Sequence, residues 1–212
     1  MTARSALGLA FGDLFRNSWR LVGVNAVLGA VLVFSVFAAV AVHALLVLAV
    51  LAGPVAAALA HCSVTLVRTG NLEFADAWEG LRLHWRRGLE FGAAALAFVV
   101  LAGFAIRFYA RSSAGWPFAF VTLYVVILLG IYAVVLLTIA VAKPDEPLRL
   151  IAREAATVGA QRPGATLLLG LALLLVNLAG VAAALMPFLT ITVAYSFVAV
   201  AHFVLPAEAK EV

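Results

Sequence analysis

The chain has 212 residues, of which 66% are hydrophobic and 11% are charged. Soluble domains carry about 25% charged residues, so this composition excludes a water-soluble globular domain and indicates an integral membrane protein covered by lipid. The net charge of +4 would suggest a nucleic-acid partner in a soluble protein. In a membrane protein an excess of Lys and Arg in the loops orients the helices, and we therefore expect no nucleic-acid binding.

The first apolar run, from Leu21 to Val67, contains no Lys, Arg, Asp or Glu over 47 residues. A single helix of that length would measure about 70 Å, against a hydrocarbon core of about 30 Å. The run must therefore fold back on itself, and we predict spans at Leu21–Val42 and Leu45–Val67 with a turn near His43. Gly53-Pro54 is the alternative place for the turn, because proline removes a backbone donor.

Four further apolar runs follow, and each is long enough to cross a membrane. They lie at Leu89–Phe108, Pro117–Ala142, Gly164–Leu185 and Pro187–Val204. Continuous apolar runs are typical of membrane helices, whereas barrel strands alternate between apolar and polar residues. The predicted fold class is an all-α membrane protein in which residues 1–212 form one integral domain with six transmembrane helices.

The basic residues predict the orientation of these spans. With the N-terminus inside, 12 of the 14 Lys and Arg residues fall in cytoplasmic segments, and only Arg107 and Arg111 fall outside. Such an asymmetry is the positive-inside pattern. We therefore expect a multi-pass protein of the bacterial cell (inner) membrane with both termini in the cytoplasm.

An amphipathic segment, Asn71–Gly88, precedes the third span. Its apolar stripe consists of Phe74, Trp78, Leu81 and Trp85. This spacing is helical, and Asn71 is a plausible N-cap. The opposite face is charged and ends in Arg82, Arg86 and Arg87. Trp78, Trp85 and the three arginines are the predicted cytoplasmic contact site for anionic lipid or for a protein partner.

The same pattern occurs before the other two pairs of spans. The N-terminal stripe consists of Leu7, Phe11, Leu14, Phe15 and Trp19, and the third stripe, within Asp145–Gly159, consists of Leu148, Ile151, Ala155 and Val158. The chain is therefore predicted to contain three quasi-repeats, at about 5–67, 71–142 and 145–204, each an amphipathic helix followed by a transmembrane hairpin. Such repeats can frame a central site, or can be duplication without a pathway.

Several of these residues resemble a known family. Val24-Asn25, the run from Gly53-Pro54 to Leu59, Phe74-Ala75-Asp76-Ala77-Trp78 and Pro187-Phe188-Leu189 are similar to the YesL-like family. The stretch from Asn25 to Gly53 is longer than that family leads one to expect. The resemblance implies a bacterial multi-pass membrane protein associated with carbohydrate uptake systems, with an ABC transporter or another membrane protein as its partner.

Polar residues inside the spans are few, and His61, Asn177 and His202 are the candidates for an intramembrane polar site. His61 and His202 could meet within a three-hairpin bundle. Cys62 follows His61 and points about 100° away on a helix, so the two cannot share a metal ion. We expect no catalytic residues, no metal and no cofactor, because the sequence contains no Walker loop, no HExxH or GxSxG motif and no pair of catalytic carboxylates.

The sequence thus predicts a non-enzymatic accessory or regulatory component of a carbohydrate transport system. Its contact surface would be the cytoplasmic layer of amphipathic helices. The alternative is a small transporter or channel with a path between the three hairpins. The oligomeric state remains open.

Overall fold

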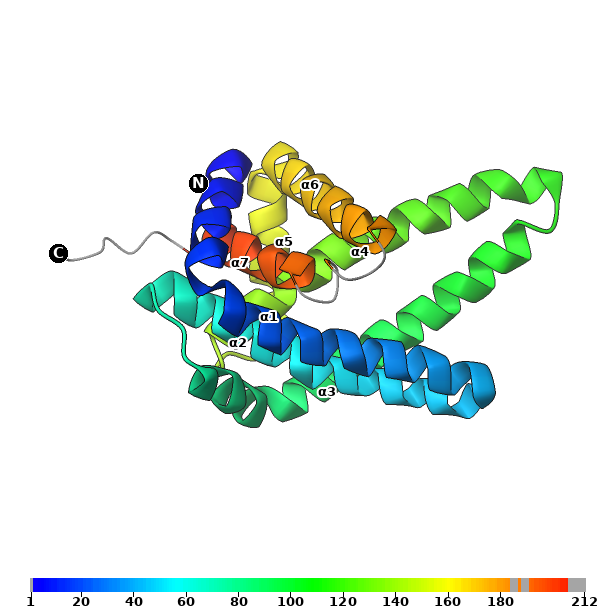
Figure 1. The fold of residues 1–212 in the computed structure, drawn as a ribbon. Coiled ribbons are helices and arrows are strands. Elements are labelled where there is room, and N and C mark those ends of the chain that lie inside the picture. Colours follow the sequence, from blue (N-terminus) through cyan, green and yellow to red (C-terminus); the bar gives the residue numbers. More distant parts are fainter. Residues whose placement is uncertain (1, 184–186, 188–190, 206–212) are drawn as a thin grey trace.

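The computed structural model describes residues 2–183, 187 and 191–205, and these residues form helices and no strand. The elements are α1 (Ala3–Ala41), η1 (His43–Leu51), α2 (Ala52–Thr69), α3 (Phe74–Tyr109), η2 (Ser113–Gly115), α4 (Trp116–Ala142), α5 (Leu148–Gln161), α6 (Pro163–Ala182) and α7 (Val193–Val204). Figure 1 shows the α1–η1 turn and the α3–α4 turn on the same side of the molecule.

Five stretches in the described part are long and apolar enough to cross a membrane. They are Trp19–Ala39, Val47–Thr69, Phe74–Tyr109, Ser113–Ala142 and Pro163–Ala182. The class of helical membrane protein is therefore supported. The sixth predicted span, Pro187–Val204, contains the 12-residue helix α7, which at about 18 Å is shorter than the hydrocarbon core. Because 188–190 lie outside the described residues, a sixth span remains a prediction.

The first apolar run reverses at Val42, next to the predicted turn at His43. Val42 has φ −139° and ψ 108°, an extended conformation that ends α1. The following 3₁₀ helix, η1, returns along α1 and continues into α2. Pro54 lies in the first turn of α2, where a missing N–H leaves no helical hydrogen bond unmade, so Gly53-Pro54 does not reverse the chain.

The first two amphipathic segments do not form separate helices, contrary to the prediction. α1 runs without interruption from Ala3 to Ala41, and α3 runs from Phe74 to Tyr109. Nothing in either junction prevents the i to i−4 hydrogen bonds from continuing, although Figure 1 shows α1 changing direction along its length. Only the third segment, α5, is separate, because Pro163 follows Arg162 and cannot donate to the preceding turn.

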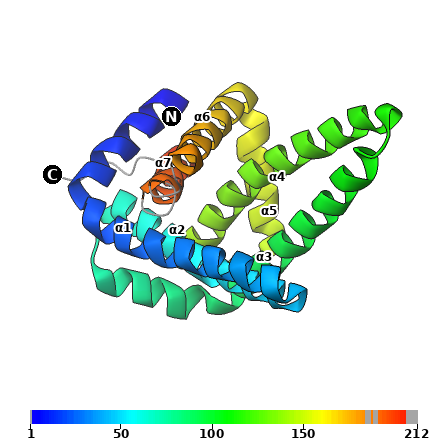
Figure 2. The same ribbon diagram turned by 45° about the vertical axis from the view of Figure 1, so that its right-hand side comes forward.

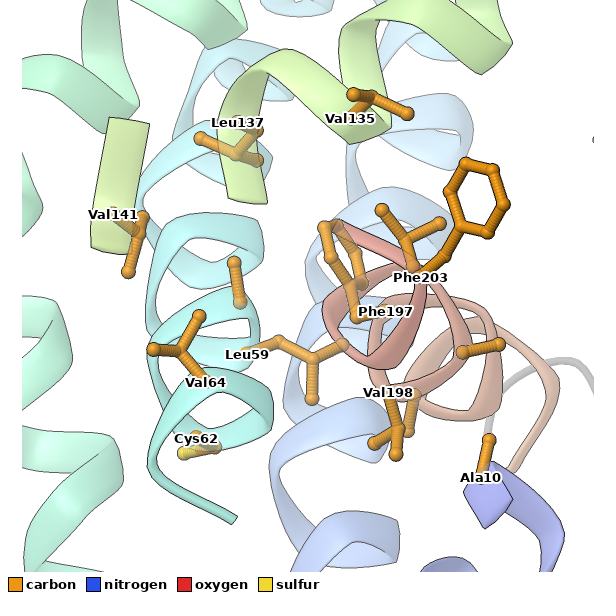
Figure 3. Close-up of a cluster of buried hydrophobic side chains, with 14 of the residues drawn as sticks. Ala10, Leu59, Cys62, Val64, Val135, Leu137, Val141, Phe197, Val198 and Phe203 are labelled. Carbon is orange, nitrogen blue, oxygen red and sulfur yellow. The ribbon is translucent and has the colours of Figure 1, made fainter. Parts of the chain in front are cut away.

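Helix α7 forms the centre of the structure. It packs against α1, α2 and α4, and Val198 and Ala199 are fully buried. Figure 3 shows Phe197 and Val198 of α7 gathered with Leu59 of α2 and Val135 of α4. Hydrogen bonds of Asn177 with Ser196 and Thr192 join α6 to α7, but the described parts of these two helices do not pack along each other as a regular pair.

The far ends of α3 and α4 form an apolar arm that extends from the rest of the bundle (Figures 1 and 2). Its large side chains are mostly exposed, and Phe104 and Phe120 are examples from the two helices. A soluble protein rarely exposes a continuous apolar surface of this kind. Lipid is the solvent that accommodates it.

Helices α2 and α3 approach each other most closely, because glycine lies on both sides of the contact. A Cβ atom on Gly88 would lie 2.5 Å from Cα of Pro54, and Gly92 likewise faces backbone atoms of Val50 and Gly53. Gly88 and Gly92 form a Gly-x-x-x-Gly pair, the spacing that lets membrane helices pack backbone to backbone. This contact fixes which face of α3 points inward.

Candidate functional site

The aromatic stripe of α3 is exposed. Trp78 is 70% exposed, Phe74 52% and Trp85 44%, while Leu81 is half-buried. Among the described residues nothing buries these side chains, which is the arrangement expected of residues that contact lipid or another protein.

The folded chain joins this stripe to the N-terminal one. Trp19 lies edge to face on Phe74, with 4.8 Å between ring centroids. Phe15 and Phe11, both exposed, continue the aromatic surface along α1. We call the aromatic rim the set Phe11, Phe15, Trp19, Phe74, Trp78 and Trp85. Trp19 and Phe74 are far apart in the sequence, so the two stripes meet only because α1 passes the start of α3 at this point.

Arg20 holds this junction together. Its Nη1 donates a hydrogen bond of 3.0 Å to Oδ1 of Asn71 and another to the carbonyl of Leu72. The guanidinium also lies 5.1 Å from the ring centroid of Trp19, a cation–π distance. Asn71 therefore anchors α1 and is not the predicted N-cap of α3. Glu73 is the N-cap, and its N–H donates to the Asp76 carboxylate at 2.7 Å.

The three predicted arginines separate into two groups. Arg82 and Arg86 are exposed, as expected of a contact site. Arg87 is half-buried and donates to the carbonyls of Ala140 at 2.9 Å, Lys143 at 3.3 Å and Glu146 at 2.9 Å. A cation at the C-terminus of a helix satisfies carbonyls that lack a helical partner and is favoured by the helix dipole. Arg87 therefore takes part in a contact between helices, and its predicted role in binding lipid or a partner stays a prediction.

The buried face of the 74–88 segment consists of small residues and one histidine. Gly80, His84 and Gly88 are buried against α2, and His84 is only 2% exposed. The ring of His84 lies 5.4 Å from that of His61, and its Nε2 has no hydrogen-bond partner among the described residues. His84 is not among the residues predicted from the sequence. His84 lies four residues from both Gly80 and Gly88, a spacing that places the three on one helical face. The aromatic stripe on the other face is the more obvious pattern in the sequence.

His61 and His202 do not meet. His61 faces His84, whereas Nε2 of His202 lies 2.7 Å from Oδ2 of Asp13, in the N-terminal part of α1. Asp13 also pairs with Arg16 at 3.3 Å. The Asp13–His202 contact therefore joins α1 to the end of α7.

Asn177 lies in a small polar cluster between α6 and α7. Its Nδ2 donates to the carbonyl of Leu173 and to Oγ of Ser196, both at 2.8 Å, and its Oδ1 accepts from Oγ1 of Thr192 at 3.1 Å. The bond to Leu173 lies within α6, whereas the bonds with Ser196 and Thr192 join α6 to the start of α7, which is the common role of such residues in membrane bundles.

Within the described ranges, no group of three or more His, Cys, Asp or Glu side chains could hold a metal ion. Cys62 is a buried free thiol. Comparisons of the chain with protein-family models, with curated proteins and with solved structures find no match.

Proposed function

We propose that this protein is a non-enzymatic membrane protein that acts as an accessory or regulatory partner of a carbohydrate transport system, through the aromatic rim and the neighbouring Arg82 and Arg86 on its cytoplasmic side. The observation that carries the proposal is the contrast between two sets of polar and aromatic residues. Asn177 and His202 are engaged in contacts within the chain, whereas Trp78, Arg82 and Arg86 are exposed. The carbohydrate assignment rests on the resemblance to the YesL-like family.

The aromatic rim suits an interfacial contact. Trp and Arg are both favoured where a protein meets lipid head groups, because each has an apolar body and a polar or charged tip. Arg82 and Arg86 add positive charge beside the rim and would be attracted to anionic lipid or to an acidic protein surface. A transporter would instead require polar groups along a path through the bundle.

Charge reversal at the rim tests the proposal. Arg82→Glu combined with Arg86→Glu should remove partner proteins or anionic lipids that co-purify in mild detergent, and should reduce sugar uptake by the native host at normal protein abundance. Arg87 is left unchanged because it holds α4. The matched control is Arg107→Glu with Arg111→Glu, the same charge change on exposed residues near the α3–α4 turn.

Equal effects of the two double variants would contradict the proposal. A second contradicting result would come from a variant in which apolar residues replace His61, Asn177 and His202. If this variant lost uptake at normal abundance while the Arg82→Glu, Arg86→Glu variant kept it, the proposal would be wrong. That second result would favour the alternative, a small transporter or channel.

A further inference from the structure

A cavity of about 190 Å³, open to the surface, lies between α4, α5 and α6. Its walls include Tyr132 and Val135 of α4, Ala155 and Gly159 of α5, and Thr166 and Leu167 of α6. We propose that this cavity binds one acyl chain of an anionic phospholipid from the cytoplasmic leaflet, with the ester group at Thr166 and the phosphate near Arg162.

The lining excludes most other occupants. The cavity is almost entirely apolar, so its walls offer hydrogen-bond partners to few polar ligands and favour an apolar occupant. A helix of a second protein, with a diameter of about 10 Å, is too wide for this volume. A stretch of one flexible hydrocarbon chain fits, with the rest of that chain in the surrounding bilayer, which supplies it.

Two features indicate that the space is available to a ligand. A Cβ on Gly159 would meet no atom within 4 Å. Oγ1 of Thr166 is buried and has no hydrogen-bond partner among the described residues, whereas the Tyr132 hydroxyl already donates to the carbonyl of Ala152 at 2.9 Å. A buried hydroxyl without a partner is costly, and an ester carbonyl would accept its hydrogen bond.

Charge complementarity favours an anionic head group. Gly159 and Thr166 both line the cavity, and Arg162 lies between them in the chain, at the junction of α5 and α6. Arg149 and Arg153 are exposed on α5. Basic residues on the helices that form an apolar site attract anionic lipids.

Native mass spectrometry of the detergent-purified protein tests the proposal, with dioleoylphosphatidylglycerol and dioleoylphosphatidylcholine as probes. The wild type should retain one phosphatidylglycerol, with an affinity about tenfold above that for phosphatidylcholine. Gly159→Phe should fill the cavity and abolish this retention. Gly130→Phe is the matched control, because a Cβ on this exposed glycine of α4 also meets no atom within 4 Å.

Unchanged retention by Gly159→Phe, or equal affinity for the two phospholipids, would overturn the proposal. So would equal competition by oleate, since the ligand would then be a free fatty acid. A second measurement uses the wild type alone, with phosphatidylglycerol carrying a photoreactive diazirine on its acyl chain. The label should map to 155–167, and labelling spread evenly over the exposed apolar helices would contradict the site.

Discussion

Arg87 of α3 donates a hydrogen bond of 2.9 Å to the carbonyl of Ala140 in the last turn of α4, 53 residues away in the chain. Arg68 of α2 reaches the carbonyl of Ala142 at 3.4 Å. The C-terminus of α4 is therefore held by cations from two other helices, where the helix dipole favours positive charge.

The first prediction concerns this contact. Arg87→Ala should lower the free energy of unfolding by about 2–4 kcal/mol, because charge-assisted hydrogen bonds to partly buried carbonyls are lost. The neighbouring Arg86→Ala is the control and should change it by less than about 0.5 kcal/mol. Thermal or denaturant unfolding in detergent measures both. Equal effects would mean that the Arg87 contacts do not stabilise the fold.

The second prediction concerns the α2–α3 contact. Gly88→Ala should destabilise the protein by about 1–3 kcal/mol or more, because its Cβ would lie 2.5 Å from the backbone of Pro54. Gly103→Ala in the same helix meets no atom within 4 Å and should be neutral or slightly stabilising. The comparison requires melting temperatures of both variants in one detergent. A tolerated Gly88→Ala would contradict the close packing.

The third prediction concerns pH. The hydrogen bonds from Nζ of Lys143 to the Glu154 carboxylate, at 2.7 and 2.9 Å, raise the pKa of Lys143 above its usual value of 10.5. A raised pKa in the folded state stabilises the protein below the unfolded pKa, and this contribution disappears as pH rises through the folded pKa. Because Lys143 is 41% exposed, the contribution should not exceed about 1 kcal/mol. Unfolding measured from about pH 8 to above 10.5 should show the loss in the wild type and a smaller loss in Lys143→Met.

The fourth prediction concerns topology. Both termini should be cytoplasmic, given the asymmetry of basic residues and the 2.7 Å contact between Asp13 and His202. Alkaline phosphatase, which is active only outside the cytoplasm, should be inactive when fused to either end. An insertion in the Ser113–Gly115 turn should be active and serves as the control. Activity at one terminus alone would indicate an odd number of spans.

The sequence by itself determined the class of protein, because 66% hydrophobic residues in long runs can form only a lipid-embedded helical structure. It also located the long apolar stretches within α1, α3, α4 and α6 and the stripe of Phe74, Trp78 and Trp85, since apolar length and helical spacing are local properties.

The tertiary structure alone decided which side chains meet. Helical periodicity gives the face on which a residue lies but not the neighbour that covers it. The sequence therefore did not show that Arg87, unlike Arg86, bonds to α4, or that His84 lies against His61. The contact between Trp19 and Phe74 and the central position of α7 could not be predicted from the sequence for the same reason. Both depend on contacts between residues far apart in the chain, which are set by the packing of whole helices.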